Sequence, residues 1–211
     1  MNPYQVVQDF EKEMAKFVGS PFAVAVDSCT NALFLSCVYL KVDEITLPNK
    51  TYVSVPCSVI HAGGKVRFEN YDWQGIYQLK PYPIYDSACQ LFKGMYIDGS
   101  HQCISFSSNK PLNIGKGGMI FTDDFKAVCW YRKARYEGRA EVSIMEDNFD
   151  MIGWNMYMTP EQASRGLLLL SSYVRPEIRG LLLLSSYVRP EIRTPIYPDL
   201  SKYEIYTKAN R

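Results

Sequence analysis

Residues 22–39, FAVAVDSCTNALFLSCVY, place a short strand directly before a helix and indicate the class of fold. Phe22 to Val26 is an apolar run of the kind found in buried strands. Asp27 and Ser28 then supply a helix N-cap, and Asn31 to Tyr39 reads as a helix. A strand that leads straight into a helix is the unit from which α/β proteins are built.

The same alternation continues along the chain. Apolar residues at helical spacing predict a helix over 7–17, and Thr159-Pro160-Glu161-Gln162 is a strong helix start. The other expected elements are strands at 44–47, 65–69, 83–86, 103–107 and 118–122, and helices at 51–62 and 125–136. This pattern predicts an α/β fold with a mostly parallel central sheet flanked by helices.

Composition narrows the functional classes. The chain has 211 residues, of which 47% are hydrophobic, and its 23 basic and 22 acidic residues leave a net charge of +1. That balance argues against a general nucleic-acid binder. We found no apolar run that would span a bilayer and no secretory signal core, so we expect a cytoplasmic protein without membrane or nucleic-acid partners. Six cysteines without a CxxC pair and two histidines predict no metal site and reduced thiols.

Polar residues follow several of the expected strands. Ligands of α/β sheets bind at the carboxyl ends of strands, where Asp27-Ser28, Asp86 and Ser105 fall. Amides at the helix start after Ser28 suit a phosphate, and the Asp86 carboxylate suits a protonated pyridine nitrogen. Tyr52 could stack on a flat ring, and Lys110 could form an imine if its amine is neutral. Each residue alone has an ordinary alternative as a cap, a packed ring or a solvated charge.

The order of these pieces is more specific than any one of them. The pieces are S-x-T-x-A-L at 28–33, P-x-x-T-Y at 48–52, D-S-A at 86–88, S-F-x-x-x-K at 105–110 and G-x-G-G at 115–118. In this order the sequence resembles the DegT/DnrJ type of sugar aminotransferases, which are pyridoxal phosphate (PLP) enzymes of fold type I. Residues 153–159 are similar to the family's G-[YF]-N-Y-R-M-[ST] motif. The resemblance runs from the N-terminal helix to about Leu170.

The resemblance implies a role for each matching residue. Lys110 would carry PLP as an internal aldimine and move the proton between the two substrate carbons, and Asp86 would pair with the pyridinium nitrogen. Tyr52 would stack on the cofactor ring. The phosphate would be bound by Thr30, Asn31 and Ser105. Asn155 would reach the phosphate of a neighbouring subunit, which implies a homodimer with shared sites.

Several positions depart from the family pattern. The substituted positions are Cys29, Cys89, Lys116 and Tyr157, with Cys89 standing where a glutamine or histidine normally contacts the cofactor. By comparison with the family pattern, we expect the segment between Asp72 and Asp86 to be shorter than usual and most of the small C-terminal domain to be missing. The stretch RGLLLLSSYVRPEI occurs at 165–178 and again at 179–192, and its perfect identity favours a recent tandem duplication or a sequence artefact over a functional repeat.

We therefore expect a shortened PLP-binding large domain over 1–164, a duplicated helical segment over 165–192 and a tail over 193–211. The favoured function is transfer of an amino group from an amino acid, glutamate in the simplest case, to a nucleotide-linked keto sugar for polysaccharide or glycoside biosynthesis. One alternative is a PLP-fold protein that binds the cofactor but has lost efficient transamination. Another is a fragment of a longer enzyme.

Overall fold

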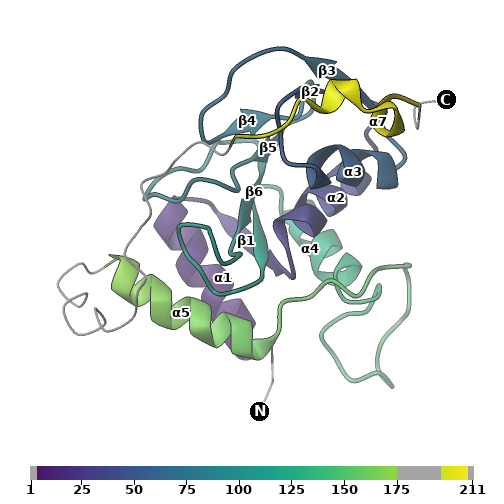
Figure 1. The fold of residues 1–211 in the computed structure, drawn as a ribbon. Coiled ribbons are helices and arrows are strands. Elements are labelled where there is room, and N and C mark those ends of the chain that lie inside the picture. Colours follow the sequence, from purple (N-terminus) through teal and green to yellow (C-terminus); the bar gives the residue numbers. More distant parts are fainter. Residues whose placement is uncertain (1–3, 175–195, 209–211) are drawn as a thin grey trace.

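The computed structural model describes residues 4–174 and 196–208 (Figure 1). Helices and strands alternate through most of the first range. In chain order they are α1 (Gln5–Val18), β1 (Phe22–Val26), α2 (Cys29–Tyr39), β2 (Glu44–Pro48), α3 (Ser54–His61), β3 (Lys65–Glu69), β4 (Tyr77–Gln78), β5 (Ile84–Asp86), β6 (His101–Ser105), β7 (Gly118–Thr122), α4 (Phe125–Ala134), α5 (Pro160–Val174), the 3-10 helix η2 (Leu200–Lys202) and α7 (Glu204–Lys208).

The strands form two sheets. The larger has the order β1-β7-β6-β5-β4, and β2 and β3 make a separate parallel pair. Strands β1, β5 and β6 run in one direction, whereas β7 and the two-residue β4 run against them. Gly118, the first residue of β7, lies in register with Val26 of β1 on one side and with Ser105 of β6 on the other.

The predicted α/β class is confirmed, but the prediction of a mostly parallel sheet is wrong for the larger sheet. Of its strand pairings, only β5 with β6 is parallel. The cause is the connection over 106–117, which turns the chain back beside β6 and inserts β7 between β1 and β6. Apolar patterns predict where strands lie, but not which strand becomes the neighbour of another.

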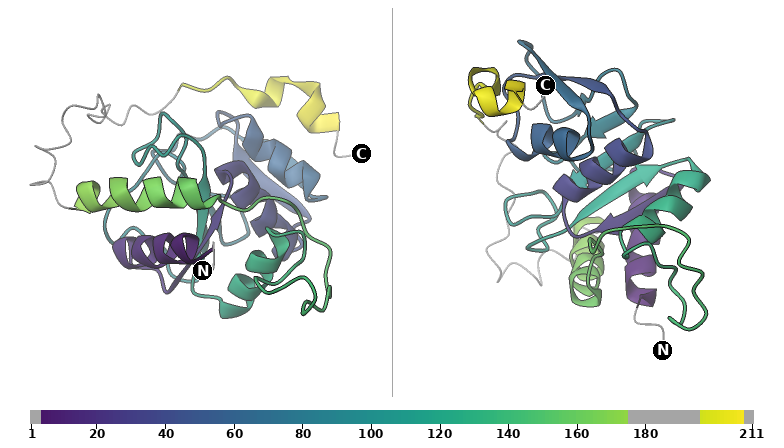
Figure 2. Two further views of the ribbon diagram at one scale, coloured as in Figure 1. Left: turned by 90° about the horizontal axis from the view of Figure 1, so that it is seen from below. Right: turned by 90° about the vertical axis from the view of Figure 1, so that its right-hand side faces the viewer.

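Apolar side chains form one core on each face of the larger sheet. Along β1, Ala23 and Ala25 face the core shared with α1 and α5, and Val24 and Val26 face the core shared with α2, α3 and α4. This alternation follows from the two-residue period of a strand. The molecule is therefore layered, with α1 and α5 side by side on one face of the sheet and the remaining large helices on the other (Figures 1 and 2).

Helix ends follow the local signals closely. Gly19 ends α1 in the left-handed conformation at φ 81°. Ser28 caps α2 by accepting a hydrogen bond from Asn31 N–H at 3.2 Å. At α5, Gln162 N–H donates to Thr159 Oγ1 and Thr159 N–H donates to Gln162 Oε1, so the predicted helix start is confirmed and takes the form of a capping box.

A buried ion pair ties α1 to the sheet and to the end of α4. Arg135 donates through Nη1 to Glu11 Oε1 and to the carbonyl oxygen of Ala25, and both charged side chains are buried. Glu11 Oε1 also accepts the N–H of Ala25 at 2.9 Å. Arg135 Nη2 also donates to Glu141 Oε1 at 2.9 Å, and Arg132 Nη2 donates to Glu11 Oε2 at 3.0 Å, so losing one member leaves a buried charge with fewer partners.

Helix α5 crosses the boundary that we predicted at residue 164, running as one helix from Pro160 to Val174. It packs closely on α1: a Cβ added at Gly166 would lie 2.5 Å from the ring of Phe10. The end of the first duplicated stretch and all of the second lie outside the described residues. The division into three segments stays a prediction.

The C-terminal residues 196–208 return to the β2–β3 pair. Leu200 is buried and donates its N–H to the carbonyl oxygen of Asn49. The backbone of Asp199 forms an isolated antiparallel β-bridge with that of Lys50. The ring of Tyr206 contacts Phe68 of β3. This part of the predicted tail is therefore packed onto the body of the protein (Figure 1).

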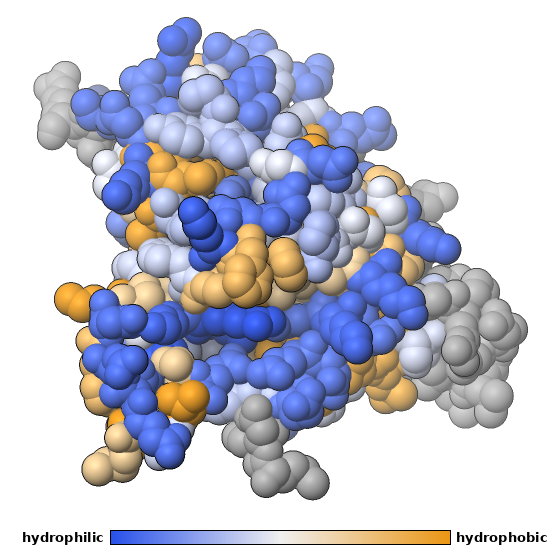
Figure 3. Space-filling model, turned by 180° about the vertical axis from the view of Figure 1, so that it is seen from behind, coloured by the Kyte–Doolittle hydropathy of each residue, from blue (hydrophilic) through white to orange (hydrophobic). Residues whose placement is uncertain are grey.

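Hydrophilic side chains cover most of the face opposite to that of Figure 1, with apolar side chains gathered in smaller patches (Figure 3). In the connection between α4 and α5, several large apolar side chains are exposed, and Met145 and Ile152 have exposed fractions of 90% and 91%. The others are Val142, Ile144 and Phe149.

None of the helices in the described ranges has both the length and the hydropathy needed to cross a bilayer.

Candidate active site

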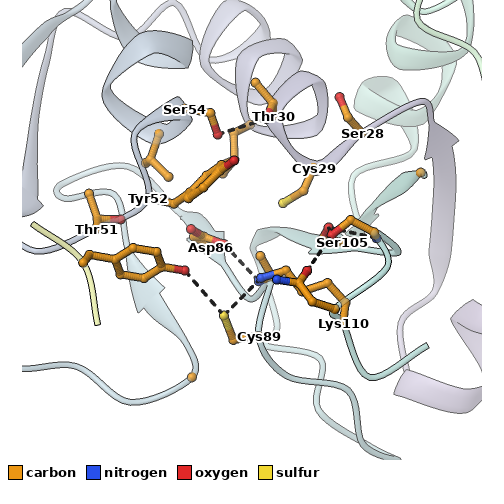
Figure 4. A pocket seen from close by; sticks show the side chains of 18 of the residues that line it. Ser28, Cys29, Thr30, Thr51, Tyr52, Ser54, Asp86, Cys89, Ser105 and Lys110 are labelled. Carbon is orange, nitrogen blue, oxygen red and sulfur yellow. Dashed lines mark hydrogen bonds between the residues drawn. The ribbon is translucent and has the colours of Figure 1, made fainter. Parts of the chain in front are cut away.

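A cavity of about 280 Å³ lies at the carboxyl ends of β1, β5 and β6. Ser28, Asp86 and Ser105, which we call the rim, line it as predicted from their places at strand ends, whereas Asp27, predicted with them, does not. Lys110 enters from the connection between β6 and β7, and Thr30 and Ser54 lie on the opposite side at the starts of α2 and α3 (Figure 4).

Asp86 is held at the floor of this cavity with an exposed fraction of 6%. Its Oδ1 accepts the N–H of Ala88 at 2.9 Å, and its Oδ2 accepts the hydroxyl of Tyr77 at 2.8 Å. Burial raises the pKa of Asp86, while these two donors and the charge of Lys110 oppose the rise. A buried carboxylate supported in this way suits a cationic partner in the cavity.

Lys110 approaches the cavity beside a thiol. Its Nζ donates to Cys89 Sγ at 3.4 Å, and the hydroxyl of Tyr197 lies 4.0 Å from the same sulfur (Figure 4). The turn that carries Lys110 is closed by its own N–H, which donates to the carbonyl oxygen of Ser107 at 3.0 Å. An amine and a carboxylate thus face one enclosed space from different elements.

The first turn of α2 offers an anion site at the other end of the cavity. Within the described residues, the N–H groups of Cys29 and Thr30 donate to no protein acceptor. Thr30 Oγ1 donates to Ser54 Oγ at 2.9 Å, which joins α2 to α3 beside the cavity. Free amides at a helix start bind phosphate and other anions.

Three aromatic rings stand at one side of the cavity. Tyr52 has an exposed fraction of 54%, and its ring centre lies 6.0 Å from that of Tyr197. Tyr197 in turn lies nearly parallel to Trp73, with an angle of 16° and a centre-to-centre distance of 6.1 Å. These rings give the cavity an apolar wall against which a flat ligand can pack.

Most of the predicted site residues meet in this cavity. Those that line it are Lys110, Asp86, Thr30, Tyr52 and Ser105. Asn31 does not line it, because its N–H donates to Ser28 Oγ and its side chain donates to Asp27 Oδ1 at 2.7 Å. Asn155 lies elsewhere and donates through Nδ2 to Glu137 Oε1 at 2.9 Å. The roles of all these residues stay predictions.

The sequence did not single out three residues that shape the site. They are Trp73 and Tyr197, which line the cavity, and Tyr77, which binds Asp86. Tyr197 belongs to the segment that we predicted to be only a tail, and its partner Cys89 lies 108 positions away. No local pattern marks such contacts, since each depends on the packing of distant segments.

Besides Cys89, the substituted positions Cys29 and Lys116 bear on the site. Burial, with a smaller contribution from the charge of Asp86, raises the pKa of the Cys29 thiol well above its usual value, so this side chain is neutral. Lys116 Nζ lies 3.7 Å from Asp27 Oδ2, so this lysine is paired across the turn before α2.

The chain is similar in sequence to a known protein family and to several characterised proteins. A model of the DegT/DnrJ/EryC1/StrS aminotransferase family matches residues 1–84 and 96–175. The spore coat polysaccharide biosynthesis protein SpsC of Bacillus subtilis is 44% identical over 198 residues, covering 72% of this chain and 48% of SpsC. The GDP-perosamine synthase of Caulobacter vibrioides is 26% identical over 213 residues, covering 78% of this chain and 56% of that enzyme. The chain thus spans about half the length of these relatives.

The arrangement of the elements is also found in solved structures. A protein from Bacillus cereus described as a PLP-dependent aminotransferase superposes with a TM-score of 0.69 at 17% identity, covering 86% of this chain and 64% of that chain. At this identity the likeness concerns the fold. The predicted resemblance and the predicted fold-type-I α/β class are therefore confirmed.

Proposed function

Because this chain belongs to the DegT/DnrJ/EryC1/StrS aminotransferase family, we propose that it binds PLP in the cavity at the rim and acts as an aminotransferase. The observation that carries the proposal is the meeting of Lys110, Asp86 and the first turn of α2 around one enclosed space. The expected amino donor is an amino acid such as glutamate. The expected acceptor is a keto sugar, nucleotide-linked, used for polysaccharide or glycoside biosynthesis in the cytoplasm.

The residues present fit this cofactor. PLP carries a phosphate, a pyridine nitrogen and an aldehyde, and the cavity offers a matching group for each. Free amides at Cys29 and Thr30 suit the phosphate, the Asp86 carboxylate suits the nitrogen in its protonated form, and the Lys110 amine suits the aldehyde. Gly118 keeps the space beside the Ser28–Cys29 turn free of side-chain atoms.

Each side chain has a distinct task in the proposed reaction. When bound, PLP withdraws electrons from the substrate carbon that loses a proton. Lys110 would bind the cofactor through Nζ and later accept and return that proton. Asp86 would hold the proton on the ring nitrogen, and Tyr52 would pack against the ring. Thr30, through its amide, and Ser105, through its hydroxyl, would orient the phosphate.

A homodimer is part of the proposal. Asn155 lies outside the cavity of its own chain, as a residue that serves a neighbouring subunit would. The exposed Met145 and Ile152 belong to the same connection between α4 and α5, and exposed apolar groups of this kind favour a protein interface. A homodimer predicts twice the chain mass in solution.

A second candidate is a protein that binds PLP without efficient turnover. The contact of Lys110 Nζ with Cys89 Sγ favours it, because Cys89 stands where the family has a residue that contacts the cofactor. In this case the cavity would load PLP but would not exchange amino groups.

Absorbance spectroscopy tests both candidates. Purified protein titrated with PLP should develop a visible band that Lys110→Ala removes and that Lys126→Ala, at an exposed position on α4, leaves unchanged. No band in the wild type at saturating PLP would refute the cofactor proposal. Added glutamate should then convert the bound cofactor to its amine form. Bound PLP that no amino acid converts would favour the second candidate.

A further inference from the structure

Tyr77 lies next to Asp86, in the segment between Asp72 and Asp86. Strand β4 pairs antiparallel with β5 so that Tyr77 is directly opposite Asp86. Both residues are buried, with exposed fractions of 5% and 6%. The Tyr77 hydroxyl donates to Asp86 Oδ2 at 2.8 Å, on the oxygen that the Ala88 amide leaves free. The carboxylate is therefore fixed from two sides.

The hydrogen bond belongs to a chain with a defined direction. Thr51 Oγ1 lies 2.5 Å from the hydroxyl oxygen of Tyr77. A phenol has one proton, and Tyr77 gives it to Asp86, so Thr51 is the donor to Tyr77. The ring of Tyr77 also packs on Trp73 with a centre-to-centre distance of 4.6 Å. Packing and the Thr51 hydroxyl thus hold Tyr77 in the orientation in which it serves Asp86.

We propose that Tyr77 is a positioning residue that orients Asp86 and stabilises its ionised carboxylate for a cationic partner in the cavity. The partner is the protonated ring nitrogen of PLP, so this part of the inference rests on the proposed function. The segment between Asp72 and Asp86 supplies Tyr77 from β4, a strand of two residues.

The electrostatic reasoning depends on every group that faces Asp86. Burial disfavours the charged carboxylate, and the groups that oppose burial are the Ala88 amide, the Tyr77 hydroxyl and the Lys110 ammonium. The remaining titratable groups that interact with it are the thiols Cys29 and Cys103 and the phenol Tyr197. Burial raises the pKa of each of these three, so they are neutral around pH 7 and do not replace the lost donor.

Removing the Tyr77 hydroxyl leaves a buried carboxylate oxygen without its donor. A hydrogen bond to a charged group is stronger than one between neutral groups, so its loss should raise the pKa of Asp86 by about one unit or more. The Asp86 carboxyl would then take up a proton at a higher pH. In that form it no longer carries the negative charge that favours the pyridinium cation.

The test uses Tyr77→Phe, which keeps the ring and removes only the hydroxyl. In a PLP titration followed by absorbance across a pH series, without substrate, the acidic limb of binding should move to higher pH by about one unit, which corresponds to an affinity about tenfold lower at any pH on that limb. Thr51→Val should shift the limb in the same direction by less. Tyr131→Phe is the matched control, because it removes a buried hydroxyl that contacts His101 away from the cavity.

A second measurement separates this inference from the proposed function. Infrared difference spectra of the cofactor-free protein, with the Asp86 band identified through Asp86→Asn, report the pH at which the carboxyl takes up a proton. Wild-type protein that fails to bind PLP, but whose Asp86 band moves in Tyr77→Phe, would reject the cofactor and keep the effect of Tyr77 on Asp86. The inference would be overturned if the Asp86 band and the PLP binding profile stayed unchanged in both Tyr77→Phe and Thr51→Val. If Tyr77→Phe does not fold, Thr51→Val alone tests the inference, and an unchanged Asp86 band in that variant would overturn it.

Discussion

Gly118→Ala should disturb the site from inside the sheet. Gly118 begins β7, and a Cβ added there would lie 2.3 Å from the carbonyl carbon of Ser28 and 2.4 Å from the nitrogen of Cys29. Carbon atoms in ordinary contact stand about 3.5 Å apart, so the turn before α2 would have to retreat by roughly 1 Å. Backbone on both sides leaves no flexible side chain to absorb the change.

The size of the effect follows from that displacement. Overpacking of this kind costs about 1–3 kcal/mol of folding free energy. The amides of Cys29 and Thr30 would move with the turn, and a displacement of about 1 Å in a positioned site costs up to about 100-fold in function. We therefore expect PLP affinity to fall by between about 10- and 100-fold while the variant still folds.

Urea denaturation and PLP titration measure the two effects separately. Gly64→Ala is the control, since its Cβ would press on Val42 and Val59 at 3.0 Å, away from the cavity. It should lower stability while leaving PLP affinity as in the wild type. Wild-type PLP affinity in a folded Gly118→Ala protein would refute the reasoning, because the turn would then have moved without consequence or not at all.

Three further predictions concern other parts of the structure. Glu11→Gln should lower the free energy of unfolding by about 3 kcal/mol in urea denaturation, because Arg135 stays buried with fewer carboxylates, and a loss below about 1 kcal/mol would contradict this. Burial lowers the pKa of His101, so as the pH drops the imidazole takes up its proton at a higher pH in the unfolded chain than in the folded protein, and stability should fall below about pH 6.5. His101→Asn should make this fall less steep, and the same substitution at the exposed His61 should not. Tyr197→Ala should weaken PLP binding by less than about tenfold and leave the denaturation midpoint near that of the wild type, since the side chain is only half-buried.

Local signals were enough to predict most elements. The strands at 22–26 and 65–69 lie where the sequence predicts them. Residues 22–26 form a short apolar run that suits a buried strand, and residues 65–69, KVRFE, alternate polar and apolar side chains as a strand with one buried face does. The helix expected from residue 51 begins at Ser54, and the strand expected at 103–107 lies at His101–Ser105. These shifts are small because the caps and turns that limit each element are local.

The candidate site was predictable only in part. Asp86, Ser105 and Lys110 could be grouped because each follows a strand, and the carboxyl ends of such strands meet. Tyr77 and Tyr197 could not, since nothing in QGIYQL or PIYP differs from an ordinary packed tyrosine. Their positions depend on β4 pairing with β5 and on residues 196–208 returning to β2–β3, which are long-range events without a local pattern.

The register across β7 sets the width of the site. Val26 and Ser105 both pair with Gly118, so the ends of β1 and β6 stand two strand spacings apart, about 10 Å. Main-chain hydrogen bonds fix that separation, and the glycine between the two strands adds no side chain. Substitutions along the rim can therefore change charge and hydrogen bonding without changing the span of the opening. In this fold the peptide backbone determines how large a ligand group fits between β1 and β6, and the side chains determine which group it is.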